Sequence, residues 1–132
     1  MKQKFEPIAD KCGEIVEYLM SFPGLSPQDE FALRLCSEEA VENVVSYAYE
    51  GGAGWLEAGI ERVGDAIVIS LRDSGTPFNP LAKPDPDITL SAEERPIGGL
   101  GIFLCKQMMD SVSYDYADGC NCLTMVKNIK TA

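Results

Sequence analysis

Apolar residues recur every three or four positions in two stretches near the start of the chain. The first stretch, residues 8–22, precedes a Pro-Gly break, and the second opens at Ser26-Pro27 and runs to Gly51-Gly52. A Ser before a Pro is typical of a helix N-cap followed by the first helical residue. The apolar stripe of the second stretch consists of Phe31, Leu35, Cys36, Ala40, Val44, Val45 and Ala48. This spacing predicts two helices, of which the second is the longest in the chain.

Alternating apolar and polar residues mark the strands. Residues 54–63 and 66–72 alternate on either side of Gly64-Asp65, which predicts a hairpin. Residues 112–116 and 122–129 predict a second hairpin, turned at Asp118-Gly119, and a short helix is expected just before it. Helices followed by two hairpins favour a mixed or antiparallel sheet covered on one face by helices. The expected fold class is therefore α+β, in the form of an α/β sandwich.

Residues 79–96 show no periodicity and contain four prolines and a cluster of acidic side chains. A loop of this length within a small domain is either disordered or a functional lid. The length of 132 residues corresponds to one domain spanning 1–132, with this segment as its lid.

The charge balance excludes several classes of partner. Eleven basic against 21 acidic residues give a net charge of −10. Such a chain repels phosphate backbones and anionic lipid, so we expect no binding to nucleic acid or to a membrane surface. A phosphorylated ligand would need a metal ion or backbone amides to offset its charge.

The absence of histidine and the arrangement of cysteines limit the chemistry further. Without His, the chain cannot carry a Ser-His-Asp triad or a His-ligated zinc. The five cysteines include only one close pair, Cys120 and Cys122, which lacks metal-site spacing. We expect free, buried or half-buried thiols in a reducing compartment. The start does not resemble a signal peptide and no stretch has the length of a membrane span, so a cytoplasmic protein is expected.

Three groups of residues could carry chemistry. Glu39 and Asn43 are four residues apart and share one helix face, with Tyr47 one turn further on. An amide oxygen at Asn43 would suit a hard cation, although the same spacing fits a solvated polar face.

The second group, Asp73-x-Gly75, stands at a strand end, where it fits a ligand-reading carboxylate or a plain Asx turn. The third, residues 98–101, places glycines at a helix start, where free amides bind anions. No Lys-Ser/Thr follows the glycines, so a P-loop is excluded, and the Rossmann fingerprint also fails.

The order of these groups resembles a known family. Residues 39–43, 73–78 and 98–102 are similar to the successive N, G1 and G2 boxes of the GHKL ATPase superfamily. Within this superfamily, the sequence pattern of residues 37–49 and the C-terminal stretch 123–127 resemble the anti-sigma factor serine kinases. The likeness covers roughly residues 8–130 and implies a Bergerat-type fold that holds ATP between the long helix and the lid.

The resemblance also implies roles for individual residues. Asn43 would hold Mg²⁺, Asp73 would accept a hydrogen bond from the adenine amino group, and Glu39 would be the general base. The remaining residues expected at the nucleotide are Tyr47, Gly75, Phe78, Arg95, Gly99, Leu100, Gly101 and Ile102. Of these, Gly99, Leu100 and Gly101 would give backbone amides to the phosphates. Arg95 would reach a phosphate or a partner protein, and an exposed Arg without such a role fits equally.

The sequence departs from that family at two places. Tyr47 replaces a frequent His, and Cys120-Asn121-Cys122 occupies the stretch where a Gly-Thr pair normally faces the nucleotide, so no contact is assigned there.

The implied function is an ATP-dependent protein-serine kinase that phosphorylates a serine on an antagonist protein, sequesters a sigma factor, or does both, in a homodimer. An ATP-sensing module without phosphotransfer, a histidine kinase catalytic domain acting on another chain, and a structural α+β protein are the alternatives.

Overall fold

The computed structural model describes residues 1–49, 54–81 and 100–129. Most of the expected lid, together with Arg95 and Gly99, lies outside the described residues.

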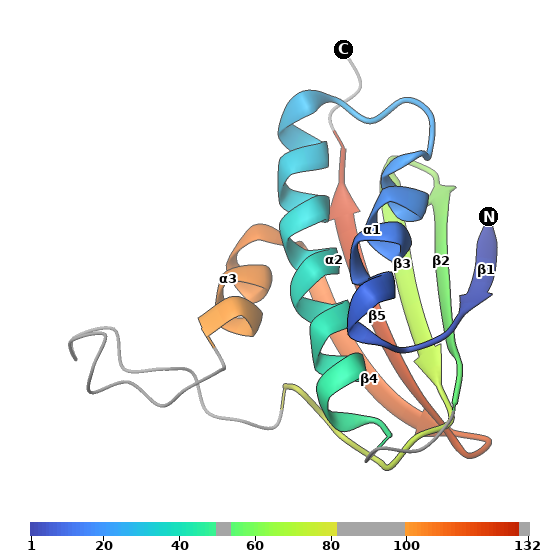
Figure 1. Cartoon of the computed structure of the whole chain (residues 1–132). Helices are drawn as coiled ribbons and strands as arrows, with labels where there is room; N and C mark the ends of the chain where they lie inside the picture. The colour runs from blue at the N-terminus through green and yellow to red at the C-terminus, as the bar shows by residue number, and fades with distance from the viewer. Residues whose placement is uncertain (50–53, 82–99, 130–132) are drawn as a thin grey trace.

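In the described residues, one sheet and three α-helices form the fold. In chain order the elements are β1 (Lys2–Phe5), the 3₁₀ turn η1 (Ala9–Lys11), α1 (Cys12–Met20), α2 (Pro27–Tyr47), β2 (Leu56–Val63), β3 (Ala66–Asp73), α3 (Leu100–Met108), β4 (Ser111–Ala117) and β5 (Cys120–Asn128). The strands lie in the order β1-β2-β3-β5-β4, and every neighbouring pair is antiparallel. The described helices lie over one face of this sheet (Figure 1). The expected α+β class is confirmed.

Local signals in the sequence set the element boundaries. The Ser26 Oγ accepts a hydrogen bond from the Asp29 N–H at 3.1 Å, and Pro27 is the first residue of α2, as predicted. The two hairpins turn at Gly64 (φ 61°) and at Asp118 (φ 55°) and Gly119 (φ 74°). Positive φ is easiest for Gly and tolerated by Asp, which explains why these positions turn the chain.

Four expectations about the elements need correction. Strand β1 was not expected; it is short and rich in Lys, as edge strands often are. Residues 9–11 form a 3₁₀ turn in place of the predicted first helical turn. Helix α2 ends at Tyr47, before the predicted glycine pair. Phe31 is 67% exposed and does not belong to the buried stripe of α2.

The hydrophobic core lies between the sheet and the helices. Its fully buried large side chains are Ile15, Leu19, Leu33, Val41, Leu56, Ile60, Ile67, Ile69, Leu71 and Met125. All five cysteines are free and buried or half-buried, as the sequence predicts. None of the helices in the described part of the chain is long and apolar enough to cross a membrane.

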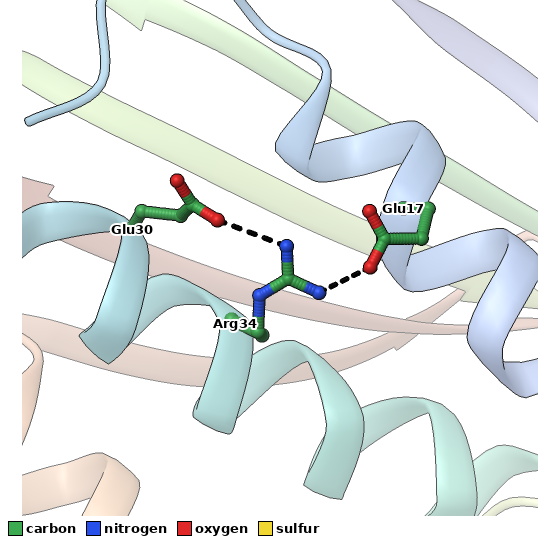
Figure 2. Close-up of polar contacts among 3 residues, drawn as sticks. All are labelled: Glu17, Glu30 and Arg34. Atoms are coloured by element: carbon green, nitrogen blue, oxygen red, sulfur yellow. Dashed lines mark hydrogen bonds and ion pairs between the residues drawn. The ribbon is translucent and has the colours of Figure 1, made fainter. Parts of the chain in front are cut away.

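An ion-pair network joins α1 to α2 at the surface. Arg34 on α2 donates to Glu30 Oε1 on the same helix at 2.9 Å and to Glu17 on α1 (Figure 2). The hydrogen bond from Arg34 lowers the pKa of the Glu17 carboxyl. Because exposed ion pairs contribute little to stability, this network adds little to the free energy of unfolding.

Candidate functional site

A small cavity lies where the second half of α2 faces the end of β3 and the beginning of β5. Its lining consists of Ala40, Asn43, Val44, Ala48, Leu71, Asp73, Phe78, Pro80, Tyr114, Asn121 and Leu123. Three of the residues singled out from the sequence therefore meet here: Asn43, Asp73 and Phe78. The cavity volume is about 30 Å³, which is room for a water molecule and not for a purine ring.

Asp73 is the last residue of β3 and is only 3% exposed. Its Oδ1 accepts hydrogen bonds from the Gly75 N–H and from the Asn121 Nδ2, both at 2.9 Å. Oδ2 has no hydrogen-bond partner among the described residues. Buried carboxylate oxygens normally have hydrogen-bond partners, so Oδ2 of this cavity-lining residue is available to accept a hydrogen bond from a ligand.

Gly75 allows the turn after β3 to touch the end of α2. A Cβ at this position would lie 2.1 Å from the Ala48 carbonyl oxygen, a distance that no real Cβ adopts. Thr76, the next residue, stabilises the same contact, because its N–H donates to the Ala48 carbonyl oxygen at 2.8 Å. The glycine is therefore required by the packing of the turn against α2.

Tyr49, just beyond α2, forms hydrogen bonds in the same region. Its hydroxyl donates to the Trp55 carbonyl oxygen at 2.7 Å and accepts from the Ser74 N–H at 2.9 Å. The end of α2, the approach to β2 and the end of β3 are thus joined at one hydroxyl.

Glu39 and Asn43 stand one turn apart on α2, and both are half-buried. Asn43 lines the cavity, and none of the described residues hydrogen-bonds to its amide. Glu39 does not line it. Partial burial, with smaller contributions from Glu42 and Glu38, raises the pKa of Glu39. The sequence suggested the like-charge effect, whereas the larger cause, burial, depends on the fold.

Tyr47 and Phe78 form a stacked pair, with ring centroids 4.8 Å apart and an interplanar angle of 24°. Phe78 is one wall of the cavity. Tyr47 does not line the cavity and is 47% exposed. Phe78 therefore forms a wall of the cavity and stacks on the last residue of α2.

Asn121 is the member of the site that sequence reasoning did not assign. It lies on β5, is 5% exposed and forms hydrogen bonds with four residues of three segments: the end of β3, the segment that follows it, and β4. A buried Asn in a strand between two cysteines was visible as a departure from the family, but its partners are set by strand register.

The glycine-rich segment is only partly described. Leu100, Gly101 and Ile102 form the start of α3, so the expected helix start is present. Ile102 is 8% exposed and does not line the cavity. Arg95 and Gly99 lie outside the described residues.

The donor set can be compared with what Mg²⁺ and ATP require. Within the described ranges, no group of three or more His, Cys, Asp or Glu side chains could hold a metal ion. Mg²⁺ commonly takes one or two protein oxygens and completes its shell with water and phosphate oxygens. The amide of Asn43 fits a metal that arrives with a phosphate ligand, and the free oxygen of Asp73 fits an amino group on a base.

Known proteins share this sequence pattern. The histidine kinase-like ATPase domain family matches residues 7–127. The chain is 28% identical over 99 residues to the serine/threonine-protein kinase BtrW of Bordetella bronchiseptica, covering 74% of this chain and 70% of that protein. It is 28% identical over 144 aligned residues to the serine-protein kinase RsbW of Bacillus mycoides, covering 98% of this chain and 89% of the relative. An RsbW of Bacillus cereus matches to the same extent.

Proposed function

Because the chain belongs to the histidine kinase-like ATPase domain family, we propose that it binds Mg-ATP and acts as a protein-serine kinase of the anti-sigma factor type. The observation that carries this proposal is Asp73, a buried carboxylate that lines a cavity together with Asn43 and whose Oδ2 has no hydrogen-bond partner among the described residues. The serine kinase names of the relatives support the choice of reaction.

In this proposal, each residue has a defined task. Asp73 accepts a hydrogen bond from the adenine amino group, and Gly75 keeps the turn against α2 so that the carboxylate stays in place. Asn43 offers its amide oxygen to the metal. Mg-ATP supplies the phosphoryl group and a cation that offsets its charge, so the chain's contribution is mainly positioning.

Glu39 takes the proton from the accepting serine hydroxyl. A serine hydroxyl is a weak nucleophile at neutral pH, and a base within reach is needed to activate it. The raised pKa of Glu39 suits this role, because a stronger base takes the proton more readily.

Entry of a purine requires the cavity to open. Phe78 is the wall that can move, because it lies on the irregular segment after β3 and one of its contacts is a ring stack with the half-exposed Tyr47. In the open state this aromatic pair would lie beside the nucleoside.

The partner proposed for the kinase is an antagonist protein with a serine acceptor, and a sigma factor is the proposed target of sequestration. We further propose a homodimer in the cytoplasm, where free thiols such as the five in this chain persist.

Thermal unfolding with and without Mg-ATP tests nucleotide binding. At about one hundred times its dissociation constant, Mg-ATP should add roughly 2.7 kcal/mol to the free energy of unfolding. The Asp73→Asn variant, measured in parallel, should lose most of this gain. If no adenine nucleotide shifts the wild-type transition, the proposal fails.

A further inference from the structure

Asn121 connects the candidate adenine-reading residue to the rest of the site. The register of the sheet sets Asn121 opposite Asp73 on β3 and opposite Tyr116 on β4. It is 5% exposed, so its side-chain amide must find its partners within the protein.

Both hydrogens of the Asn121 amide are used. The Nδ2 donates to Asp73 Oδ1 and to the Thr76 carbonyl oxygen, each at 2.9 Å. Thr76 belongs to the turn that also touches the end of α2. Asn121 therefore joins the carboxylate to the turn that follows it.

Both acceptor positions of the amide are used as well. Its Oδ1 accepts from the Phe78 N–H at 3.0 Å and from the Tyr114 hydroxyl. Desolvation, the largest cause, raises the pKa of Tyr114, so this hydroxyl remains a donor at neutral pH. Two donors at Oδ1 fix the orientation of the amide, because a flipped amide would place its own N–H groups against them.

This arrangement has a consequence for ligand recognition. With its four hydrogen-bonding positions filled by protein atoms, Asn121 has none left for a base. Its effect on a ligand passes through Asp73, where Oδ1 is occupied and Oδ2 is left as an acceptor.

We propose that Asn121, oriented by Tyr114, is a positioning residue that makes the site prefer a base with an amino group over one with a carbonyl oxygen. The proposal rests on the proposed function, since it assumes that a purine nucleotide binds at Asp73. It deepens that function by naming the residues that set base preference.

The experiment measures dissociation constants for ATP and for inosine triphosphate, which has a carbonyl oxygen where adenine has its amino group. Asn121→Ser should reduce the preference for ATP by about tenfold, the scale of a lost hydrogen bond to a charged group. Tyr114→Phe should reduce it in the same direction by about threefold, since only the orientation of the amide is weakened. The matched control is Tyr116→Phe, on the same strand and 44% exposed, which should leave the preference unchanged.

A merely structural role predicts a different result. If Asn121→Ser weakens both nucleotides by the same factor, Asn121 does not set base preference, while nucleotide binding still stands. If the wild type binds neither nucleotide, the proposed function fails and this proposal fails with it. Should Asn121→Ser not fold, Tyr114→Phe decides, and an unchanged preference there overturns the proposal.

A double variant separates a direct effect from one that passes through Asp73. In an Asp73→Asn background, Asn121→Ser should change the ATP preference no further, because the group it positions is gone. If Asn121→Ser reduces the ATP preference in this background as much as it does alone, Asn121 contacts the base directly and the positioning role is overturned.

Discussion

Neighbouring side chains of one type acquire different properties from small differences in burial. Glu38, Glu39 and Glu42 share α2, yet Glu38 and Glu42 are exposed while Glu39 is half-buried. Burial is the first cause of the raised pKa of Glu39, and the other two carboxylates add to it. The spacing of charges on a helix could not separate these three residues, because burial depends on what packs above them.

Replacing Glu39 by Gln tests the proposed base. The amide keeps the shape of the side chain but cannot take a proton. We expect near-normal Mg-ATP affinity and phosphotransfer at least about a hundredfold slower, the usual contribution of a general base.

Single Gln replacements at 38 and 42 are the controls for that measurement. Their rates should stay close to the wild-type rate. An equal loss at all three positions would leave an ATP-sensing module as the better description of the protein.

Glu39→Gln should also change how the stability of the protein depends on pH. Because the pKa of Glu39 is raised above its ordinary value of 4.5, the folded state binds the proton more tightly than the unfolded state does. The stability that Glu39 contributes is fully present below about pH 4.5 and is lost as the pH rises through the raised pKa. Glu39→Gln removes this loss, so the melting temperature of the variant relative to wild type should increase between pH 4 and pH 7. A difference that is constant, or that decreases with pH, contradicts the assignment.

At the scale of elements, the site depends on how closely the turn after β3 meets the end of α2. Ala48, Gly75 and Thr76 are in contact through backbone atoms, and Tyr49 joins the approach to β2 to the same place. Backbone atoms cannot move aside as side chains do. The position of Asp73 is therefore set by this contact as well as by its own strand.

Gly75→Ala should destabilise the protein because its Cβ would lie 2.1 Å from the Ala48 carbonyl oxygen. The expected loss is about 1–3 kcal/mol, the range for overpacked sites, measured by urea unfolding. The matched control is Gly13→Ala in α1, where a Cβ meets nothing within 4 Å. That change should be neutral or stabilising by up to about 1 kcal/mol. Equal effects of the two substitutions would show that the contact at Gly75 is not needed.

The elements themselves were largely predictable from the sequence. Periodicity identified α2 and both hairpins, and the Ser26-Pro27 cap and the turn glycines stand where the sequence predicts. β1 was not predicted because its four residues, Lys-Gln-Lys-Phe, include a single apolar side chain and show no alternation of apolar and polar positions. The end of α2 at Tyr47 was not predicted because the hydrogen bonds of Ala48 to the turn after β3 and of Tyr49 to the approach to β2 are tertiary contacts, which the sequence does not show.

At the scale of the whole molecule, the site joins segments far apart in the chain. Asn43, Asp73 and Asn121 meet because β3 and β5 are neighbours and α2 lies over them. Motif order suggested the first two, through resemblance to a family. The third needed the strand register, which the sequence does not specify closely enough to pair one residue with another.

The net charge of −10 opposes the approach of any polyanion, including ATP without its metal. Added salt screens this repulsion over a Debye length of about 10 Å at 0.1 M. We therefore expect the association rate of metal-free ATP, followed by stopped-flow fluorescence of a labelled analogue, to rise with ionic strength. The rate for Mg-ATP should change less, because the metal cancels part of the ligand's charge. A rate that falls with salt would contradict this, and would mean that local positive groups, with Arg95 as the first to replace by Gln, outweigh the charge of the whole chain.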